Sequence, residues 1–144
     1  MRRAEVLLVE DDAGDALMTS QILAEAPFPV RLYIARDGRQ ALQMLAEKTF
    51  RPNVVILDLN LPEISGFRML QRFDRADIPV VVFTASAQET DKVLAKGLGA
   101  VEYVVKPTDL DDFRQAVWGI VQRWCGYNSG PAGTLSGLSE GNGS

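Results

Sequence analysis

Acidic, hydroxyl and amine side chains follow four apolar segments of this sequence, each directly where the segment ends. In chain order they are Glu10 and Asp11 after residues 6–9, Asp58 after residues 54–57, Thr84 after residues 80–83 and Lys106 after residues 101–105. A carboxylate can accept a phosphoryl group, and an ammonium or a hydroxyl can stabilise the oxygens of the transferred group. If the four segments lie side by side, these residue types favour phosphoryl transfer with Asp58 as the nucleophile.

The segments that carry these residues have the pattern of parallel strands. Three of the five Val/Ile-rich runs are apolar at nearly every position, which is typical of strands that helices cover on both faces. The predicted strands are residues 6–9, 31–35, 54–57, 80–83 and 101–105, and helical patterns follow at about 15–26, after residue 38, after residue 65, at about 87–96 and from 108 or 109. Five such strand–helix units predict a parallel sheet with right-handed crossovers and helices on both of its faces.

A sheet of this kind brings the ends of its central strands together, and ligands bind outside those carboxyl ends where the strand order reverses. If the order is 2-1-3-4-5, the first and third strands are neighbours and Asp11 shares a crevice with Asp58. Their like charges then need a compensating cation. Lys106 supplies one positive charge, and Mg²⁺, which prefers oxygen ligands and keeps several waters, is the natural second.

Composition excludes several other kinds of chemistry. The 144 residues include no histidine, which excludes Ser-His-Asp and Cys-His nucleophiles, His-ligated zinc and a phosphohistidine carrier. A net charge of −4 argues against nucleic acid as a direct partner, and no apolar run is long enough to span a membrane. The sole cysteine, Cys125, fits a reducing cytoplasm. We expect one domain over residues 1–125 and a flexible Gly/Ser-rich tail at 126–144.

Four motifs, in order and at suitable spacing, closely resemble the response-regulator receiver domain of two-component signalling. They are "LLVEDD" at the first strand end, "ILDLNLPEISG" around Asp58, "FTAS" after the fourth strand and "YVVKP" after the fifth, and the resemblance spans residues 4 to about 124. It implies a three-layer α/β/α, flavodoxin-like (βα)5 fold with sheet order 2-1-3-4-5. The stretches "VEDDAGDALMTSQIL", "IPVVVFTAS" and "FRQAVWGIVQRWC" resemble stand-alone regulators, among them the phytochrome-associated ones.

The resemblance assigns roles around a divalent metal ion. Asp58 matches the phosphoacceptor, and Asp11 matches a direct ligand of Mg²⁺ or Mn²⁺. Glu10 would act on the metal mostly through water, and Asn60 would offer its backbone carbonyl. Asp12 lies one position beyond the acidic pair and is expected to be a solvated loop or helix-cap residue.

A second group of matches concerns the response to phosphorylation. Thr84 matches the switch hydroxyl, and Lys106 matches the lysine of the family's site. Tyr103 matches an aromatic residue that turns inward when the hydroxyl moves toward the phosphate, although a plain packing role is the alternative. In the family the peptide that follows the lysine, here Lys106–Pro107, is usually cis, whereas an ordinary trans proline has the higher general base rate.

The function that follows from the resemblance is a cytoplasmic signalling switch rather than an enzyme, with slow self-dephosphorylation at most. A sensor histidine kinase or phosphotransfer protein would phosphorylate Asp58. The change would then repack the fourth helix, fifth strand and fifth helix for a downstream protein partner, without a membrane or direct nucleic-acid contact. A homodimer through the last helix is expected only if Trp118 points outward, and a core or helix-packing role for Trp118 is the favoured alternative.

Two other classes of function compete with this interpretation. One is a phosphohydrolase of the haloacid-dehalogenase type, which would need a second acid two residues after Asp58, where this sequence has Asn60. The other is an interaction module that works without phosphate. The complete set of acidic, hydroxyl and amine residues argues against it.

Overall fold

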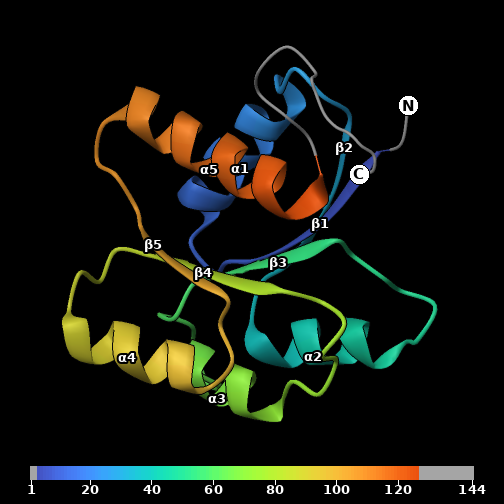
Figure 1. The fold of residues 1–144 in the computed structure, drawn as a ribbon, viewed down its shortest axis with the longest axis vertical. Helices are drawn as coiled ribbons and strands as arrows, with labels where there is room; N and C mark the ends of the chain where they lie inside the picture. Colours follow the sequence, from blue (N-terminus) through green and yellow to red (C-terminus); the bar gives the residue numbers. More distant parts are fainter. Residues whose placement is uncertain (1–2, 127–144) are drawn as a thin grey trace.

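Five short apolar runs form one parallel sheet in the computed structural model, which describes residues 3–126 (Figure 1). The strands are β1 Ala4–Val9, β2 Val30–Ala35, β3 Val54–Leu57, β4 Val80–Thr84 and β5 Glu102–Val105. Their order is β2-β1-β3-β4-β5, and every neighbouring pair is parallel. The predicted sheet order and the flavodoxin-like fold are therefore confirmed.

The helices begin where the sequence supplies a capping side chain. They are α1 Ala13–Ala24, α2 Gly38–Ala46, α3 Gly66–Arg72, α4 Glu89–Gly97 and α5 Leu110–Cys125. The residue before each of α1, α2, α3 and α5 accepts a hydrogen bond from the backbone N–H three residues later, and these caps are Asp12, Asp37, Ser65 and Asp109. The prediction that Asp12 is a cap residue is confirmed, and α1 consequently begins earlier than the expected Asp15.

The two faces of the sheet carry separate apolar cores. In Figure 1, α1 and α5 cover one face, and α2, α3 and α4 cover the other. Alternate residues of β3 enter the two cores, with Val54 and Ile56 under α1 and α5, and Val55 and Leu57 under the other three helices. All four side chains are fully buried. This burial explains why the strand is apolar at every position, and the predicted three-layer architecture is confirmed.

The register of the sheet places the strand ends at one level. Val9 pairs with Leu57, and Asp58 continues the ladder by donating its N–H to the carbonyl of Val9 at 3.1 Å. On the other side of β4, the N–H of Lys106 donates to the carbonyl of Thr84 at 2.7 Å. The residues that follow β1, β3, β4 and β5 therefore reach the same edge of the sheet.

The homodimer considered above requires Trp118 on α5 to point outward, but the Trp118 side chain points inward. Its side chain is half-buried against the core under α1 and α5, and its indole N–H donates to the carbonyl of Ile22 at 2.9 Å. The ring packs inward because α1 offers both an apolar surface and an acceptor for the N–H. The favoured packing role of Trp118 is therefore confirmed, and the condition for that dimer is not met.

Two further sequence predictions concern the ends and surface of the chain. The expected tail from residue 127 onward lies outside the described residues, and Gly126 itself ends α5 with a φ of 80° that suits a helix C-cap. Over residues 3–126, no helix is long and apolar enough to cross a membrane.

Candidate functional site

A cavity of about 570 Å³ opens at the carboxyl edge of the sheet. It brings together six of the seven residues predicted for the site: Glu10, Asp11, Asp58, Asn60, Thr84 and Lys106. The seventh, Tyr103, contacts the loop after β4 that forms one wall of this cavity. The register of the sheet thus assembles the predicted residues from four separate strand ends.

Asp58 is held at the bottom of this cavity with only 7% of its surface exposed. Its Oδ1 accepts the N–H of Asn60 at 3.1 Å, and its Oδ2 accepts from the Lys106 ammonium at 3.0 Å. Close packing of α3 fixes the loop that follows, because a Cβ on Gly66 would lie 2.5 Å from the Cα of Leu59 and 2.8 Å from the carbonyl oxygen of Asp58. The Asp58 carboxylate is therefore rigidly presented to the cavity.

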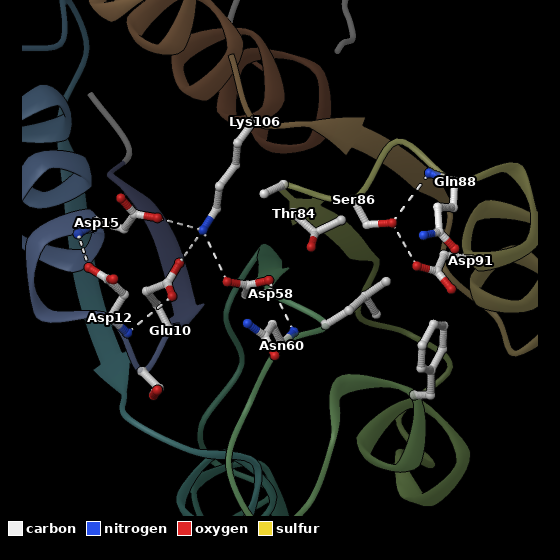
Figure 2. Close-up of a pocket in the computed structure, with 14 residues that line it drawn as sticks. Glu10, Asp12, Asp15, Asp58, Asn60, Thr84, Ser86, Gln88, Asp91 and Lys106 are labelled. Carbon is white, nitrogen blue, oxygen red and sulfur yellow. Dashed lines mark hydrogen bonds and ion pairs between the residues drawn. The ribbon is translucent and has the colours of Figure 1, made fainter. Parts of the chain in front are cut away.

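Lys106 extends from the end of β5 into the centre of a carboxylate cluster (Figure 2). Its Nζ lies 2.7 Å from Glu10 Oε1, 2.8 Å from Asp15 Oδ2 and 3.0 Å from Asp58 Oδ2. The Lys106 side chain is only 9% exposed, so its charge interacts with these carboxylates with little screening by solvent.

Burial and charge shift the pKa values of this cluster in opposed ways. Burial alone would lower the pKa of Lys106, yet its hydrogen bonds to Asp15 and Glu10 and the charge of Asp58 raise that pKa above the usual value. Burial raises the pKa of Glu10 to about 7, although its bond to Lys106 works against the rise. The cluster therefore combines an amine that stays protonated with a carboxyl group whose ionised form a further cation would stabilise.

The loop after β4 connects the cavity to α4 and β5. Thr84 is 2% exposed and lies between Asp58 and Ser86 in Figure 2. The Ser86 hydroxyl donates to Asp91 Oδ2 at 2.6 Å, and the Tyr103 hydroxyl donates to the backbone carbonyl of Ser86 at 2.9 Å. Ser86, two residues after Thr84, is therefore bonded to α4 through Asp91 and to β5 through Tyr103.

Comparison with known proteins identifies the family. Residues 6–118 match the response regulator receiver domain. The chain belongs to this family. This receiver domain is 36% identical over 128 residues to the response regulator Rcp1 of Synechocystis sp., covering 83% of the chain and 87% of that protein. It is 34% identical over 134 residues to the probable methanogenesis regulatory protein FilR2 of Methanothrix harundinacea, covering 88% of the chain and 86% of that protein.

Solved structures resemble the receiver domain over nearly their whole length. The phosphorylated cyanobacterial phytochrome response regulator RcpA superposes with a TM-score of 0.79 at 31% identity, covering 86% of this chain and 95% of that one. The Mn²⁺-bound form of Rcp1 superposes with a TM-score of 0.77 at 33% identity, covering 90% and 99%. The predicted resemblance to phytochrome-associated response regulators is confirmed.

The oxygen ligands in the cavity of the receiver domain fit a divalent metal ion. Over residues 3–126, no three or more His, Cys, Asp or Glu side chains form a ready cage for a metal. The expected site needs less, because Mg²⁺ keeps several waters and takes few protein ligands. Asp11 is exposed on the cavity wall, and Asp58 and Asn60 line the same space. These hard oxygen donors suit Mg²⁺ or Mn²⁺.

Two features of the site differ from expectation or were not expected. No peptide bond within residues 3–126 is cis, so the Lys106–Pro107 peptide is trans, the form that is favoured by about 0.5–1 kcal/mol for X–Pro bonds. Lys106 reaches its three carboxylates with this geometry. Asp15 was not predicted as a site residue. The available indication was the cap at Asp12, which places Asp15 in the first turn of α1 and at the same edge of the sheet.

Proposed function

We propose that this receiver domain is a phosphorylation switch whose Asp58 accepts a phosphoryl group from a sensor histidine kinase or a phosphotransfer protein. The observation that carries this proposal is the Lys106 ammonium, which is buried at 3.0 Å from Asp58 in a cavity open to a donor. A permanently structural ion pair would not need an open cavity beside it. The similarity to a cyanobacterial phytochrome response regulator favours a phytochrome-type sensor kinase as the donor.

The chemical step transfers a phosphoryl group from a phosphohistidine to the Asp58 carboxylate. An oxygen of the Asp58 carboxylate attacks the phosphorus of a phosphohistidine, the P–N bond breaks, and its electron pair leaves with the imidazole nitrogen. Lys106 stabilises the negative charge on the transferred group because one of its N–H donors already points at the acceptor. The Thr84 hydroxyl, at the end of β4, donates to another oxygen of that group. The product is an aspartyl-phosphate, and the domain turns over no substrate of its own apart from slow self-dephosphorylation.

A divalent metal ion completes the site in this proposal. Asp11, Asp58 and the backbone carbonyl of Asn60 would hold Mg²⁺ or Mn²⁺, and Glu10 would bind one of its waters. The ion, when bound, neutralises charge on the incoming phosphate. Rcp1, whose chain is similar, has a structure in a Mn²⁺-bound form, which supports this assignment. We place the reaction in the cytoplasm, where Mg²⁺ and kinase are both available.

The output in this proposal is a change in the surface of α4, β5 and α5. The α4 helix is loosely anchored, since Ala95 is its only buried residue within the described part of the chain. Val93 and Leu94 on α4 are 60% and 48% exposed, and Val105 on β5 is 41% exposed. Movement of Thr84 toward the phosphate would draw in Tyr103 and shift α4, so that these apolar side chains fit a protein partner.

Intact-mass measurement after incubation with acetyl phosphate and Mg²⁺ tests the proposal. We expect a mass increase of one phosphoryl group in the wild type, none in Asp58→Asn, and none in the wild type when the metal is chelated. An adduct that persists in Asp58→Asn would place the phosphate elsewhere. Equal binding of a downstream partner to wild type and Asp58→Asn would instead support the phosphate-independent interaction module.

A further inference from the structure

Asp15 is the one carboxylate bound to Lys106 to which the resemblance to receiver domains assigned no role. We infer that Asp15 is a positioning residue for phosphoryl transfer, because it holds the Lys106 ammonium so that its remaining donor points at Asp58. This inference rests on the proposed function, and it concerns how the chain of this receiver domain fixes a flexible lysine at the acceptor.

The geometry matches the donor count of an ammonium group. Lys106 has three N–H donors, and three carboxylates surround its Nζ at 2.7, 2.8 and 3.0 Å. Glu10 and Asp15 take the two shorter bonds and Asp58 takes the longest. When a phosphoryl group arrives on Asp58, the third donor can pass to a phosphoryl oxygen while the other two stay in place. The four-carbon stem of a lysine would otherwise let the charge move.

Asp15 is available for this contact because the start of α1 is satisfied without it. An acidic residue at the third helical position often bonds back to the N–H of the capping residue. Here the N–H of Asp12 donates instead to Glu10 Oε2 at 3.2 Å, and the N–H of Asp15 donates to Asp12 Oδ1 at 2.9 Å. Figure 2 shows the Asp15 carboxylate turned toward Lys106.

A purely local role for Asp15 would be its favourable charge in the first turn of a helix. That role contributes to helix stability and predicts no effect on phosphoryl transfer. The positioning role predicts slower phosphoryl transfer when Asp15 is replaced, because a neutral amide at residue 15 would bond the ammonium with roughly half the strength of a carboxylate. The two roles can therefore be separated by kinetics.

Asp12 provides a matched control inside the same cavity. Asp12→Asn removes the same unit of charge from the cavity wall, and asparagine is as good a helix cap as aspartate. Asp12 accepts from the backbone of Asp15, whereas Asp15 binds Lys106 directly. A difference between Asp12→Asn and Asp15→Asn is then a difference in contact with the ammonium.

The experiment measures the rate of Asp58 phosphorylation against acetyl phosphate concentration at saturating Mg²⁺. We expect Asp15→Asn to lower the saturating rate about fivefold with little change in the half-saturating donor concentration, and Asp12→Asn to stay within about twofold of the wild type. Asp15→Glu keeps the charge and should recover much of the rate. Thermal melts of all three variants confirm that the compared proteins are folded.

Three results would overturn the inference. The first is a wild-type rate in Asp15→Asn, which would show that the contact with Lys106 does not matter. The second is an equal loss of rate in Asp12→Asn, which would point to general charge in the cavity. The third is a change in Asp15→Asn that is confined to the half-saturating donor concentration, which would point to binding of the donor. Absence of an adduct in the wild type itself would instead contradict the proposed function. The two failures are therefore distinguishable.

Discussion

Two cations are almost completely buried at opposite ends of the sheet, and their partners differ. Lys106 follows the carboxyl end of β5 and binds three carboxylates, while Arg75 lies before the amino end of β4. The Arg75 Nη1 donates to the backbone carbonyls of Leu45, Glu47 and Phe50 at 3.0, 3.4 and 3.0 Å. The two side chains are 9% and 12% exposed, so burial alone does not distinguish them.

The kind of acceptor does distinguish the two cations. The Arg75 Nη1 donates to neutral carbonyls at and beyond the end of α2, where a helix leaves such groups without partners. Its one carboxylate contact within the described residues, from Nε to Asp77 at 3.6 Å, is with a side chain that is 52% exposed. Lys106 faces side chains whose negative charge exceeds its own, in a cavity open to a ligand. The first arrangement is complete as it stands, whereas the proposed function adds a metal ion and a phosphate to the second. We therefore expect the same type of substitution to damage stability at one end and chemistry at the other.

Lys106→Met should produce the largest effect, and it should appear in the reaction. The substitution removes a donor to the transferred phosphoryl group, and loss of one such donor lowers a rate by about a hundredfold or more. Phosphorylation of Asp58 by acetyl phosphate, followed by intact mass over time, measures it.

A second readout of Lys106→Met concerns the metal alone. Without the ammonium, Glu10, Asp15 and Asp58 lack their compensating charge, so Mg²⁺ should raise the melting temperature of this variant more than that of the wild type. An equal Mg²⁺-induced rise in melting temperature in both proteins would show that the ammonium and the metal do not neutralise the same carboxylates.

Arg75→Met should reduce the free energy of unfolding by about 2–3 kcal/mol, because three carbonyls lose a charged donor in a region with little solvent access. Urea denaturation measures the loss, and the phosphorylation rate of the folded protein should stay unchanged. Arg51→Met is the matched control. Arg51 pairs with Asp77, as Arg75 does, but its side chain is 70% exposed, so the expected loss is below about 0.5 kcal/mol.

A stability of Arg75→Met equal to that of Arg51→Met would remove the basis for the comparison. Arg75 would then be a surface residue in energetic terms, and buried cations at the two ends of the sheet would differ in more than their acceptors.

The contrast also explains what could be predicted from the sequence. Asp58 and Lys106 were predictable because an apolar run followed by a polar residue marks a strand end, and a parallel sheet places strand ends together. The role of Arg75 was not predictable, because its acceptors are backbone carbonyls 25–30 residues earlier in the chain. Every residue type has such a carbonyl, so the sequence gives no sign of which ones Arg75 meets. Asp15 was missed because its direction depends on which carboxylate caps α1. The packing role favoured for Trp118 is confirmed, but helical periodicity did not show that its N–H would meet a carbonyl of α1.

Gly66→Ala should reduce the free energy of unfolding by about 1–3 kcal/mol and also slow the phosphorylation of Asp58. Its Cβ would approach the backbone of Leu59 and Asp58 to within 2.5 and 2.8 Å, so the acceptor loop must shift. Gly97→Ala is the control, since nothing lies within 4 Å of a Cβ there and alanine favours the helix by about 0.5–1 kcal/mol. Urea denaturation and phosphorylation rates compare them. Normal phosphorylation by Gly66→Ala would show that the loop tolerates displacement.

Glu63→Gly should give the smallest effect, a gain in stability of about 0.5–1 kcal/mol, because Glu63 has a φ of 60° that a side chain disfavours. Its ion pair with Arg39 spans 3.6 Å between side chains that are 70% and 66% exposed, so losing it costs little. Glu47→Gly is the matched control. Glu47 has a φ of −74°, so glycine there should destabilise the fold by increasing the freedom of the unfolded chain. Urea denaturation should move the two midpoints in opposite directions. If both variants lose stability, the loop after Asp58 stores no backbone strain, and the rigidity of the acceptor rests on the packing of Gly66 alone.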